Sequence, residues 1–171
     1  MEIERKWMVK DWPQDREPVK TYKMRQGYVC TDPTVRIREE AESGGKTEYV
    51  LCFKSHGSDH GLVRQEIEIL VEEEKFRELE QLIGIPLIEK EQRVYALKDG
   101  LLLEVNDVDR GMPTHYMYAE IEYLTAWEAK TWRPDEDGLA EYLCDDVTSQ
   151  PGQTMAAYWN LTRLNSGTVQ E

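Results

Sequence analysis

Charged side chains alternate with apolar ones near the start of the chain, and this pattern constrains the fold more than any other feature. Glu2, Glu4 and Lys6 are spaced two apart, with Ile3 between them and Trp7 following. Successive side chains of a β-strand point to opposite sides, so residues two apart share a face. The pattern therefore predicts an extended strand with one charged face and one apolar face.

Four further segments show the same alternation, and the sign of the charge is sorted by segment. Their charged positions are Arg36 and Arg38, Lys54, the run Arg64, Glu66 and Glu68, and the pair Glu120 and Glu122. An antiparallel sheet with one face in water gives a similar alternation, but such a face usually mixes in Thr, Ser and Gln. Almost pure Glu, Arg and Lys favours a charged interior, where metal ions, a polyanion or water would offset the cost of burying charge.

Turn-forming residues divide the first 125 positions into short segments. We expect strands at 2–9, 21–29, 34–42, 46–55, 62–71, 90–97, 100–107 and 117–124. Phe76, Leu79 and Leu82 recur at helical spacing before Gly84, which predicts one helix over 73–84. In the tail we expect helical pieces after 126, near 139–143 and at 154–164, with a frayed end at 167–171. The chain is thus mostly β (α+β), forming either a sandwich or a barrel.

Length and charge exclude several classes of protein. A chain of 171 residues suits a single domain spanning 1–171, and no apolar run reaches the ~18 residues of a membrane span. The net charge is −13, from 21 basic and 34 acidic residues, which disfavours nucleic acid and anionic membranes as partners. Three cysteines without a CxxC spacing and the absence of a leader before Glu2 predict a cytoplasmic protein with reduced thiols.

An ExExK motif stands at residues 2–6, and further motifs follow it in order along essentially the whole chain. They are Gln26-Gly27-Tyr28, Val35-Arg36-Ile37-Arg38, Phe53-Lys54, Arg64-Gln65-Glu66-Ile67-Glu68, Lys90 to Arg93, Asp107, Ala119-Glu120-Ile121-Glu122, Val147-Thr148 and Tyr158-Trp159-Asn160. Together they resemble the CYTH domains of the triphosphate tunnel metalloenzymes. The resemblance implies an eight-stranded antiparallel closed barrel with charged residues lining a tunnel and helices packed outside.

Two stretches depart from the pattern of this family. Its KxR motif is one residue longer here, because Lys90 and Arg93 are separated by two residues. Its ExD motif is stretched in the same way between Glu104 and Asp107. Both members of each pair can face inward only if the strand contains a β-bulge.

The resemblance also implies roles for the charged residues, and their chemistry suits phosphoryl transfer, which depends on positioning and charge neutralisation. The expected catalytic residues are Glu2, Glu4, Lys6, Glu120 and Glu122. The expected substrate-binding residues are Lys6, Arg36, Arg38, Lys54, Arg64, Lys90 and Arg93. The expected ligands of Mg²⁺ or Mn²⁺ are Glu2, Glu4, Glu120 and Glu122, then Glu66 and Glu68, with Glu104 and Asp107.

The predicted function is metal-dependent hydrolysis of a triphosphate, with a metal-activated water attacking a terminal phosphate. Inorganic tripolyphosphate is the favoured substrate, since no aromatic and amide pair beside the motifs would recognise a base or a thiazolium ring. The alternatives within the family are a class IV adenylate cyclase and a thiamine triphosphatase. Cyclases tend to carry residues ahead of ExExK, whereas Glu2 here follows Met1.

The sequence also allows functions other than catalysis: a non-catalytic barrel that binds a polyanion, or a barrel that binds an apolar ligand. A homodimer is open as well. His56 and His60 have metal-like spacing, but we interpret their segment as a solvated loop.

Overall fold

The computed structural model describes residues 1–59 and 61–165, and most of its elements are strands. The strands are β1 (Glu2–Val9), β2 (Lys20–Thr31), β3 (Thr34–Glu42), β4 (Thr47–Lys54), β5 (Val63–Arg64), β6 (Glu66–Leu70), β7 (Ile88–Ala96), β8 (Leu102–Val108), β9 (Tyr116–Glu122) and β10 (Asp145–Asp146). The helices are α1 (Glu73–Ile83), α2 (Ala126–Thr131) and α3 (Met155–Trp159), with short 3₁₀ helices η1 (Lys98–Gly100) and η2 (Pro134–Asp137) and a π-helical turn η3 (Asn160–Leu164).

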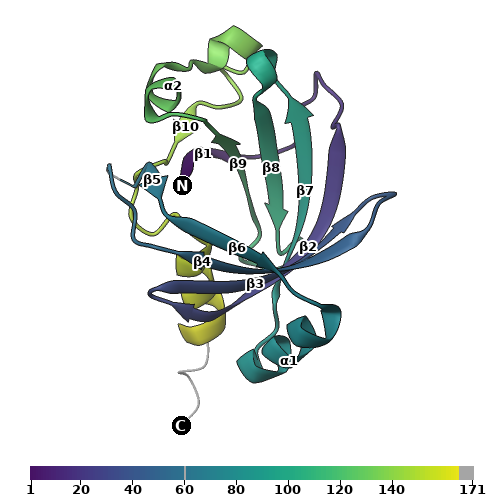
Figure 1. Ribbon diagram of the computed structural model, residues 1–171. Helices are drawn as coiled ribbons and strands as arrows, with labels where there is room; N and C mark the ends of the chain where they lie inside the picture. The colour runs from purple at the N-terminus through teal and green to yellow at the C-terminus, as the bar shows by residue number, and fades with distance from the viewer. Residues whose placement is uncertain (60, 166–171) are drawn as a thin grey trace.

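All strand pairs are antiparallel, and together they form a nearly closed barrel (Figure 1). Around the ring the order is β1, β9, β8, β7, β2, β3, β4 and β6. The ring is completed by β5, which pairs with β1 through Glu2 opposite Arg64 and Ile3 opposite Val63. The strand predicted over 62–71 is thus divided at Gln65 into two pieces that pair with different neighbours. The predicted antiparallel barrel is confirmed.

The charged faces predicted from the alternation in the sequence lie on the inside of this barrel. Across β1 and β9, Glu4 lies opposite Glu122 and Lys6 opposite Glu120, so the charged faces of neighbouring strands coincide. The intervening residues point outward, and Trp7 among them is completely buried. This outer packing fixes the strand register. A slip of one residue would turn the charged side chains outward and the apolar side chains into the barrel.

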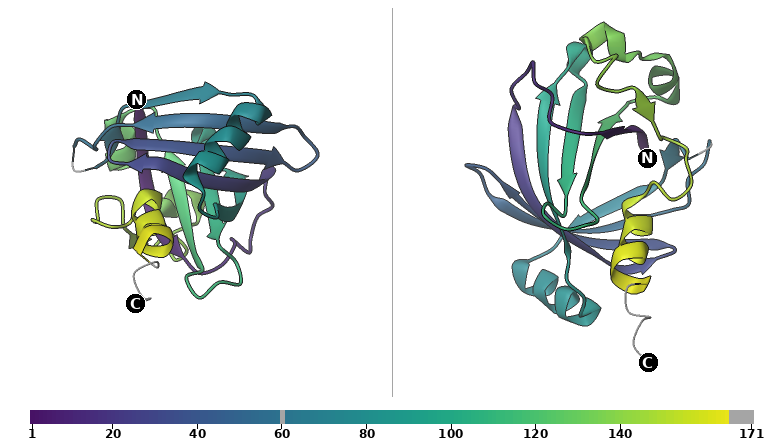
Figure 2. Two further views of the ribbon diagram at one scale, coloured as in Figure 1. Left: turned by 90° about the horizontal axis from the view of Figure 1, so that it is seen from below. Right: turned by 180° about the vertical axis from the view of Figure 1, so that it is seen from behind.

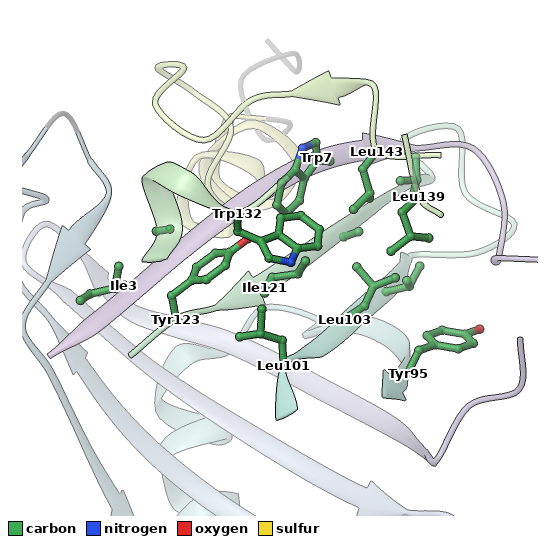
Figure 3. Packing of buried hydrophobic residues seen from close by; sticks show 14 of the residues in the cluster. Ile3, Trp7, Tyr95, Leu101, Leu103, Ile121, Tyr123, Trp132, Leu139 and Leu143 are labelled. Atoms are coloured by element: carbon green, nitrogen blue, oxygen red, sulfur yellow. The ribbon is translucent and has the colours of Figure 1, made fainter. Parts of the chain in front are cut away.

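The hydrophobic core lies outside the barrel wall in two clusters. One covers β1, β7, β8 and β9 and includes Trp7, Leu103, Ile121 and Trp132 from the segment after α2 (Figure 3). The other covers β2 and β3, where α1 and α3 contribute residues including Phe76 and Trp159. Figure 2 shows these two helices against the outer surface of the barrel. Apolar packing is therefore placed on the outside, and the interior is left to polar side chains.

The helix predicted over 73–84 is confirmed as α1. Its first turn carries acidic residues, which complement the positive end of the helix dipole. The helix ends at Gly84, whose positive φ of 65° lets its backbone N–H bond to the Glu80 carbonyl at 3.0 Å.

The tail differs from expectation at residues 139–143 and in the short strand β10, which pairs with β1. Residues 139–143 were expected to form a helix but make a single turn, closed by the bond from Leu143 N to Leu139 O at 2.8 Å. The leucines instead pack individually against the first core cluster. The helix expected at 154–164 is present as α3 followed by η3. His60 and residues 167–171 lie outside the described residues, and no helix within the described part is long and apolar enough to cross a membrane.

Candidate active site

The barrel encloses a cavity of about 700 Å³ whose wall is dominated by ionisable side chains. Seven carboxylates line it: Glu2, Glu4, Glu66, Glu68, Glu104, Glu120 and Glu122. Six cations line the same cavity: Lys6, Arg36, Arg38, Lys54, Arg64 and Lys90. Thirteen of the fifteen site residues predicted from sequence are thus brought together, although they come from eight strands.

One side of the cavity carries carboxylates close to one another. Burial, together with the charges of Glu120 and Glu2, raises the pKa of Glu4 to about 8. Burial and the neighbouring Glu120 likewise raise the pKa of Glu104 to about 7. Burial and Glu2 raise the pKa of Glu122. These shifts share one physical cause, because negative charges have been placed together with too little water or positive charge to offset them.

Lys54 joins two carboxylates from different sides of the barrel. Its Nζ lies 2.8 Å and 3.0 Å from the two carboxylate oxygens of Glu2 and 3.6 Å from Glu66 Oε1. Although burial opposes it, the charge of Lys54 lowers the pKa of Glu66. The side chains of Lys54 and Glu2 are only 12% and 10% exposed, so this pair is weakly screened by solvent.

The two arginines of β3 converge on one acceptor. Arg36 Nη2 lies 3.5 Å and Arg38 Nη2 lies 3.3 Å from Glu68 Oε1. Arg38 also bonds to Glu40 through its Nε. Arg36 Nε is buried without a hydrogen-bond partner among the described residues. A planar guanidinium with a free donor is suited to bidentate contact with a phosphate.

Strands β7 and β8 supply a second group of inward side chains. Lys90 Nζ donates to the hydroxyl of Tyr118 at 3.2 Å, and burial together with Arg38 lowers the pKa of Lys90 to about 7. Gln92 Nε2 lies 3.2 Å from Glu104 Oε2 and 3.1 Å from Asn106 Oδ1. The amide therefore joins two inward residues of β8 to β7.

A tail strap, which we define as residues 147–154, forms part of the cavity wall. It is fixed to β1, because Val147 N donates to Lys6 O at 2.9 Å and Lys6 N donates to Thr148 Oγ1 at 3.1 Å. Thr148 Oγ1 in turn donates to Asp146 Oδ1 at 2.5 Å. The strap runs from β10 to α3 beside the barrel, as the view from behind in Figure 2 shows.

Comparison with known proteins identifies the architecture. No protein-family model matches the chain. An inorganic triphosphatase of Nitrosomonas europaea is 37% identical over 133 residues, which cover 78% of this chain and 83% of that protein. The chain belongs to the CYTH family of triphosphate tunnel metalloenzymes.

Several solved structures share the fold. The inorganic triphosphatase NE1496 has a TM-score of 0.60 at 27% identity, covering 92% of this chain and 93% of that one. The PH1819 protein of Pyrococcus horikoshii OT3 has a TM-score of 0.60 at 20% identity, covering 86% and 94%. A putative adenylyl cyclase of Hippeastrum, described as having a dominant triphosphatase activity, has a TM-score of 0.57 at 18% identity, covering 83% and 88%. At the two lower identities the likeness shows the fold alone.

Two residues expected in the CYTH tunnel lie elsewhere. The bulges that would turn Arg93 and Asp107 inward are absent, since β7 and β8 pair in an unbroken register. Arg93 lies outside the barrel, where its Nε bonds to Glu91 at 2.8 Å and its guanidinium lies 4.0 Å from the centre of the Trp12 ring. The expected inward placement of Arg93 is therefore wrong.

Asp107 is buried in the wall but does not line the cavity. Its carboxylate is bonded by Arg110 and His115 from the turn that follows β8. The regular alternation of β8 turns Asn106 inward instead, in line with Glu104. The expected inward placement of Asp107 is wrong for the same reason as that of Arg93: a strand without a bulge keeps strict alternation.

Sequence reasoning also missed several cavity residues. Tyr28, Gln92, Tyr118 and Thr148 all line the cavity. Alternation could have found Gln92, two positions after Lys90, and Tyr118, two positions before Glu120. For the tail strap no periodic signal exists, because it lies outside any strand or helix.

Proposed function

We propose that this protein hydrolyses inorganic tripolyphosphate in the barrel cavity with the help of Mg²⁺ or Mn²⁺. The observation that carries the proposal is the joint presence of seven carboxylates and six cations around one cavity of about 700 Å³. Cations alone would suit any polyanion, whereas carboxylates would repel it unless metal ions lie between them. The named activity of the Nitrosomonas relative supports the same conclusion.

The carboxylates fit a hard divalent cation. Glu4, Glu104 and Glu122 all have raised pKa values because burial and like charges oppose their ionisation. Oxygen donors with unfavourable mutual repulsion are what Mg²⁺ and Mn²⁺ neutralise. The residues that would hold the ions are Glu2, Glu4, Glu120 and Glu122, with Glu66, Glu68 and Glu104 nearby. When bound, such ions supply charge neutralisation of phosphate oxygens and acidify a coordinated water.

The cations of the cavity are placed to exchange their partners for phosphates. Arg36 and Arg38 both contact Glu68, and Lys54 contacts Glu2, so these charged groups are paired with one another. A bound triphosphate offers these groups stronger acceptors, because it carries several negative charges on adjacent groups. Lys90 needs no such exchange, because the Tyr118 hydroxyl is the one hydrogen-bond partner of its Nζ among the described residues.

In the proposed reaction a water oxygen attacks the terminal phosphorus while the bond to the bridging oxygen breaks. The products are orthophosphate and pyrophosphate, and the proton lost by the water goes to a carboxylate of the cavity or to solvent. Arginines and lysines on the opposite wall stabilise the negative charge spread over the equatorial oxygens. Lys6, 3.7 Å from Glu120 Oε1, can neutralise charge near the reacting group.

The aromatic residues of the cavity favour a substrate without an organic group. Lys6 Nζ lies 3.9 Å from the centre of the Tyr118 ring, and Tyr116 stacks against the same residue. Tyr28 packs on Trp159 with ring centres 5.8 Å apart. Both cavity tyrosines are at most 6% exposed, so neither presents a free face to a base or a thiazolium ring. Binding energy then comes from the phosphate chain.

Side-by-side kinetics on tripolyphosphate, ATP and thiamine triphosphate, each with Mg²⁺ and with Mn²⁺, test the proposal. We expect the highest kcat/KM for tripolyphosphate, with phosphate release and no cyclic AMP. A preference for ATP with cyclic AMP as product would favour the cyclase alternative. Tight binding of tripolyphosphate without turnover under every metal condition would indicate a polyanion-binding barrel instead of an enzyme.

A further inference from the structure

A neutral amide contacts one of the cavity carboxylates. Gln92 of β7 and Asn106 of β8 lie directly opposite each other on neighbouring strands (Figure 1). Gln92 is 7% exposed, and Asn106 is completely buried. Gln92 Nε2 lies 3.2 Å from Glu104 Oε2 and 3.1 Å from Asn106 Oδ1. The nitrogen of this amide therefore lies between a charged and a neutral oxygen acceptor.

The two acceptors fix the orientation of the Gln92 amide. An amide nitrogen carries two hydrogens, one for each of the oxygens beside it. The reversed orientation would place Gln92 Oε1 against both oxygens, and a carbonyl oxygen cannot donate. The arrangement leaves Asn106 Nδ2 buried without a hydrogen-bond partner among the described residues, which is costly. The amide pair is therefore explained better by its effect on Glu104 than by a contribution to stability.

Glu104 differs from most of the carboxylates around it in having no cationic partner. Four of the seven cavity carboxylates form ion pairs: Glu2 and Glu66 with Lys54, Glu68 with Arg36 and Arg38, and Glu120 with Lys6. Within residues 1–59 and 61–165, the Glu104 side chain forms no ion pair and accepts its hydrogen bond from Gln92. The carboxylate is held by an uncharged group, so its negative charge is left available.

We propose that Gln92 is a positioning residue that holds Glu104 for a divalent cation without neutralising it. This inference rests on the proposed function, in which Mg²⁺ or Mn²⁺ binds between the cavity carboxylates. Hydrogen bonds from outside the ligand set orient metal ligands, and their loss typically lowers metal affinity about 10- to 100-fold. A lysine or arginine at this position would also orient Glu104, but its charge would compete with the metal ion. Arg93 does not compete, because the regular register of β7 places it outside the barrel.

Binding of Mn²⁺ to the metal-free full-length protein, measured by calorimetry without substrate, tests this role. Gln92→Met keeps the length of the side chain and removes the donor, so we expect Kd to rise about tenfold or more. Gln92→Lys keeps a donor but adds a positive charge, and we expect Kd to rise at least as much. Gln81→Met makes the first of these substitutions at an exposed position of α1 and should bind Mn²⁺ like the wild type.

The effect of Gln92 should depend on Glu104. In a Glu104→Gln background, adding Gln92→Met should change Kd by less than about twofold, because the carboxylate that Gln92 orients is already lost. A merely structural role would weaken binding equally in both backgrounds. Circular dichroism in chelator checks that each variant folds, and Gln92→Ala takes the place of Gln92→Met if that variant does not.

Three results would overturn the proposal while leaving the metal assignment intact. They are wild-type affinity in Gln92→Met, wild-type affinity in Gln92→Lys, and an equal loss of affinity with and without Glu104→Gln. Absence of Mn²⁺ binding to the wild type would overturn both the role of Gln92 and the metal assignment of the proposed function.

Discussion

Arg36 and Ile37 are adjacent in the chain but lie on opposite sides of the barrel wall. Arg36 lines the cavity, whereas Ile37 is completely buried in the second core cluster. We expect Arg36→Ala and Arg38→Ala to lower kcat/KM for tripolyphosphate, each by about 1.5 to 3 kcal/mol of lost charge-assisted contact, with the fold intact. Ile37→Ala should instead lower the free energy of unfolding by about 2 to 5 kcal/mol. Steady-state kinetics and urea denaturation separate the two effects, and normal turnover in both arginine variants would contradict the assignment of faces.

The raised pKa of Glu4 makes stability depend on pH. Because its pKa is about 8 in the folded protein against an ordinary 4.5, the folded state holds a proton that the unfolded state releases over this interval. The resulting stabilisation is fully present below pH 4.5 and is lost as the pH rises through 8. In chelator, we expect the free energy of unfolding of Glu4→Gln to fall less between pH 5 and 8 than that of the wild type, measured by urea denaturation. Parallel pH profiles for the two proteins would show that Glu4 does not titrate in this way.

At the scale of a strand, the regular register of β7 decides which of its cations reaches the cavity. Lys90 lines the cavity and Arg93 lies outside against Trp12. We therefore expect Lys90→Ala to raise KM for tripolyphosphate about tenfold or more, because one charge-assisted contact is lost. Arg93→Ala should leave kcat and KM within about twofold of the wild type, as surface substitutions usually do. A large kinetic defect in Arg93→Ala would mean that β7 contains a bulge after all.

The strands could be predicted because apolar side chains, which must be buried, alternate with charged side chains along them. Glu2, Glu4 and Lys6 could be assigned to the interior together, since alternation fixes every side chain once one is placed. The same rule, applied strictly, would have placed Gln92 and Asn106 inward in place of Arg93 and Asp107. The family motifs are made of charged residues, so the sequence analysis assigned those residues to the interior. It overlooked the neutral amides that occupy the inward positions.

Other features depend on contacts that have no local pattern. The division of one strand into β5 and β6 at Gln65 arises because its two halves pair with different neighbours. The tail strap reaches the cavity through hydrogen bonds to β1 from residues more than 140 positions away in sequence. Leu139 and Leu143 satisfy helical spacing but also serve as isolated core contacts, and packing decides between these possibilities.

For the whole molecule, we expect metal binding to be required for activity and also to increase thermal stability. In chelator we expect no turnover of tripolyphosphate, with recovery on adding Mg²⁺ or Mn²⁺. The metal should also raise Tm, since an ion at 100 times its Kd that binds only the folded barrel stabilises it by about 2.7 kcal/mol. Glu4→Gln should show a smaller rise in Tm under the same conditions, because one oxygen ligand is lost. Undiminished activity after exhaustive chelation would contradict the metal assignment.

The number of paired residues differs between neighbouring strands of the barrel. Only two residue pairs join β5 to β1, whereas nine join β2 to β3. Backbone amides at this seam should therefore exchange with deuterated water faster than those of β2 and β3, because local opening there breaks fewer hydrogen bonds. If the wall parts along this seam, we expect a linear polyanion to enter the lumen from the side, so that a long chain need not thread through an end.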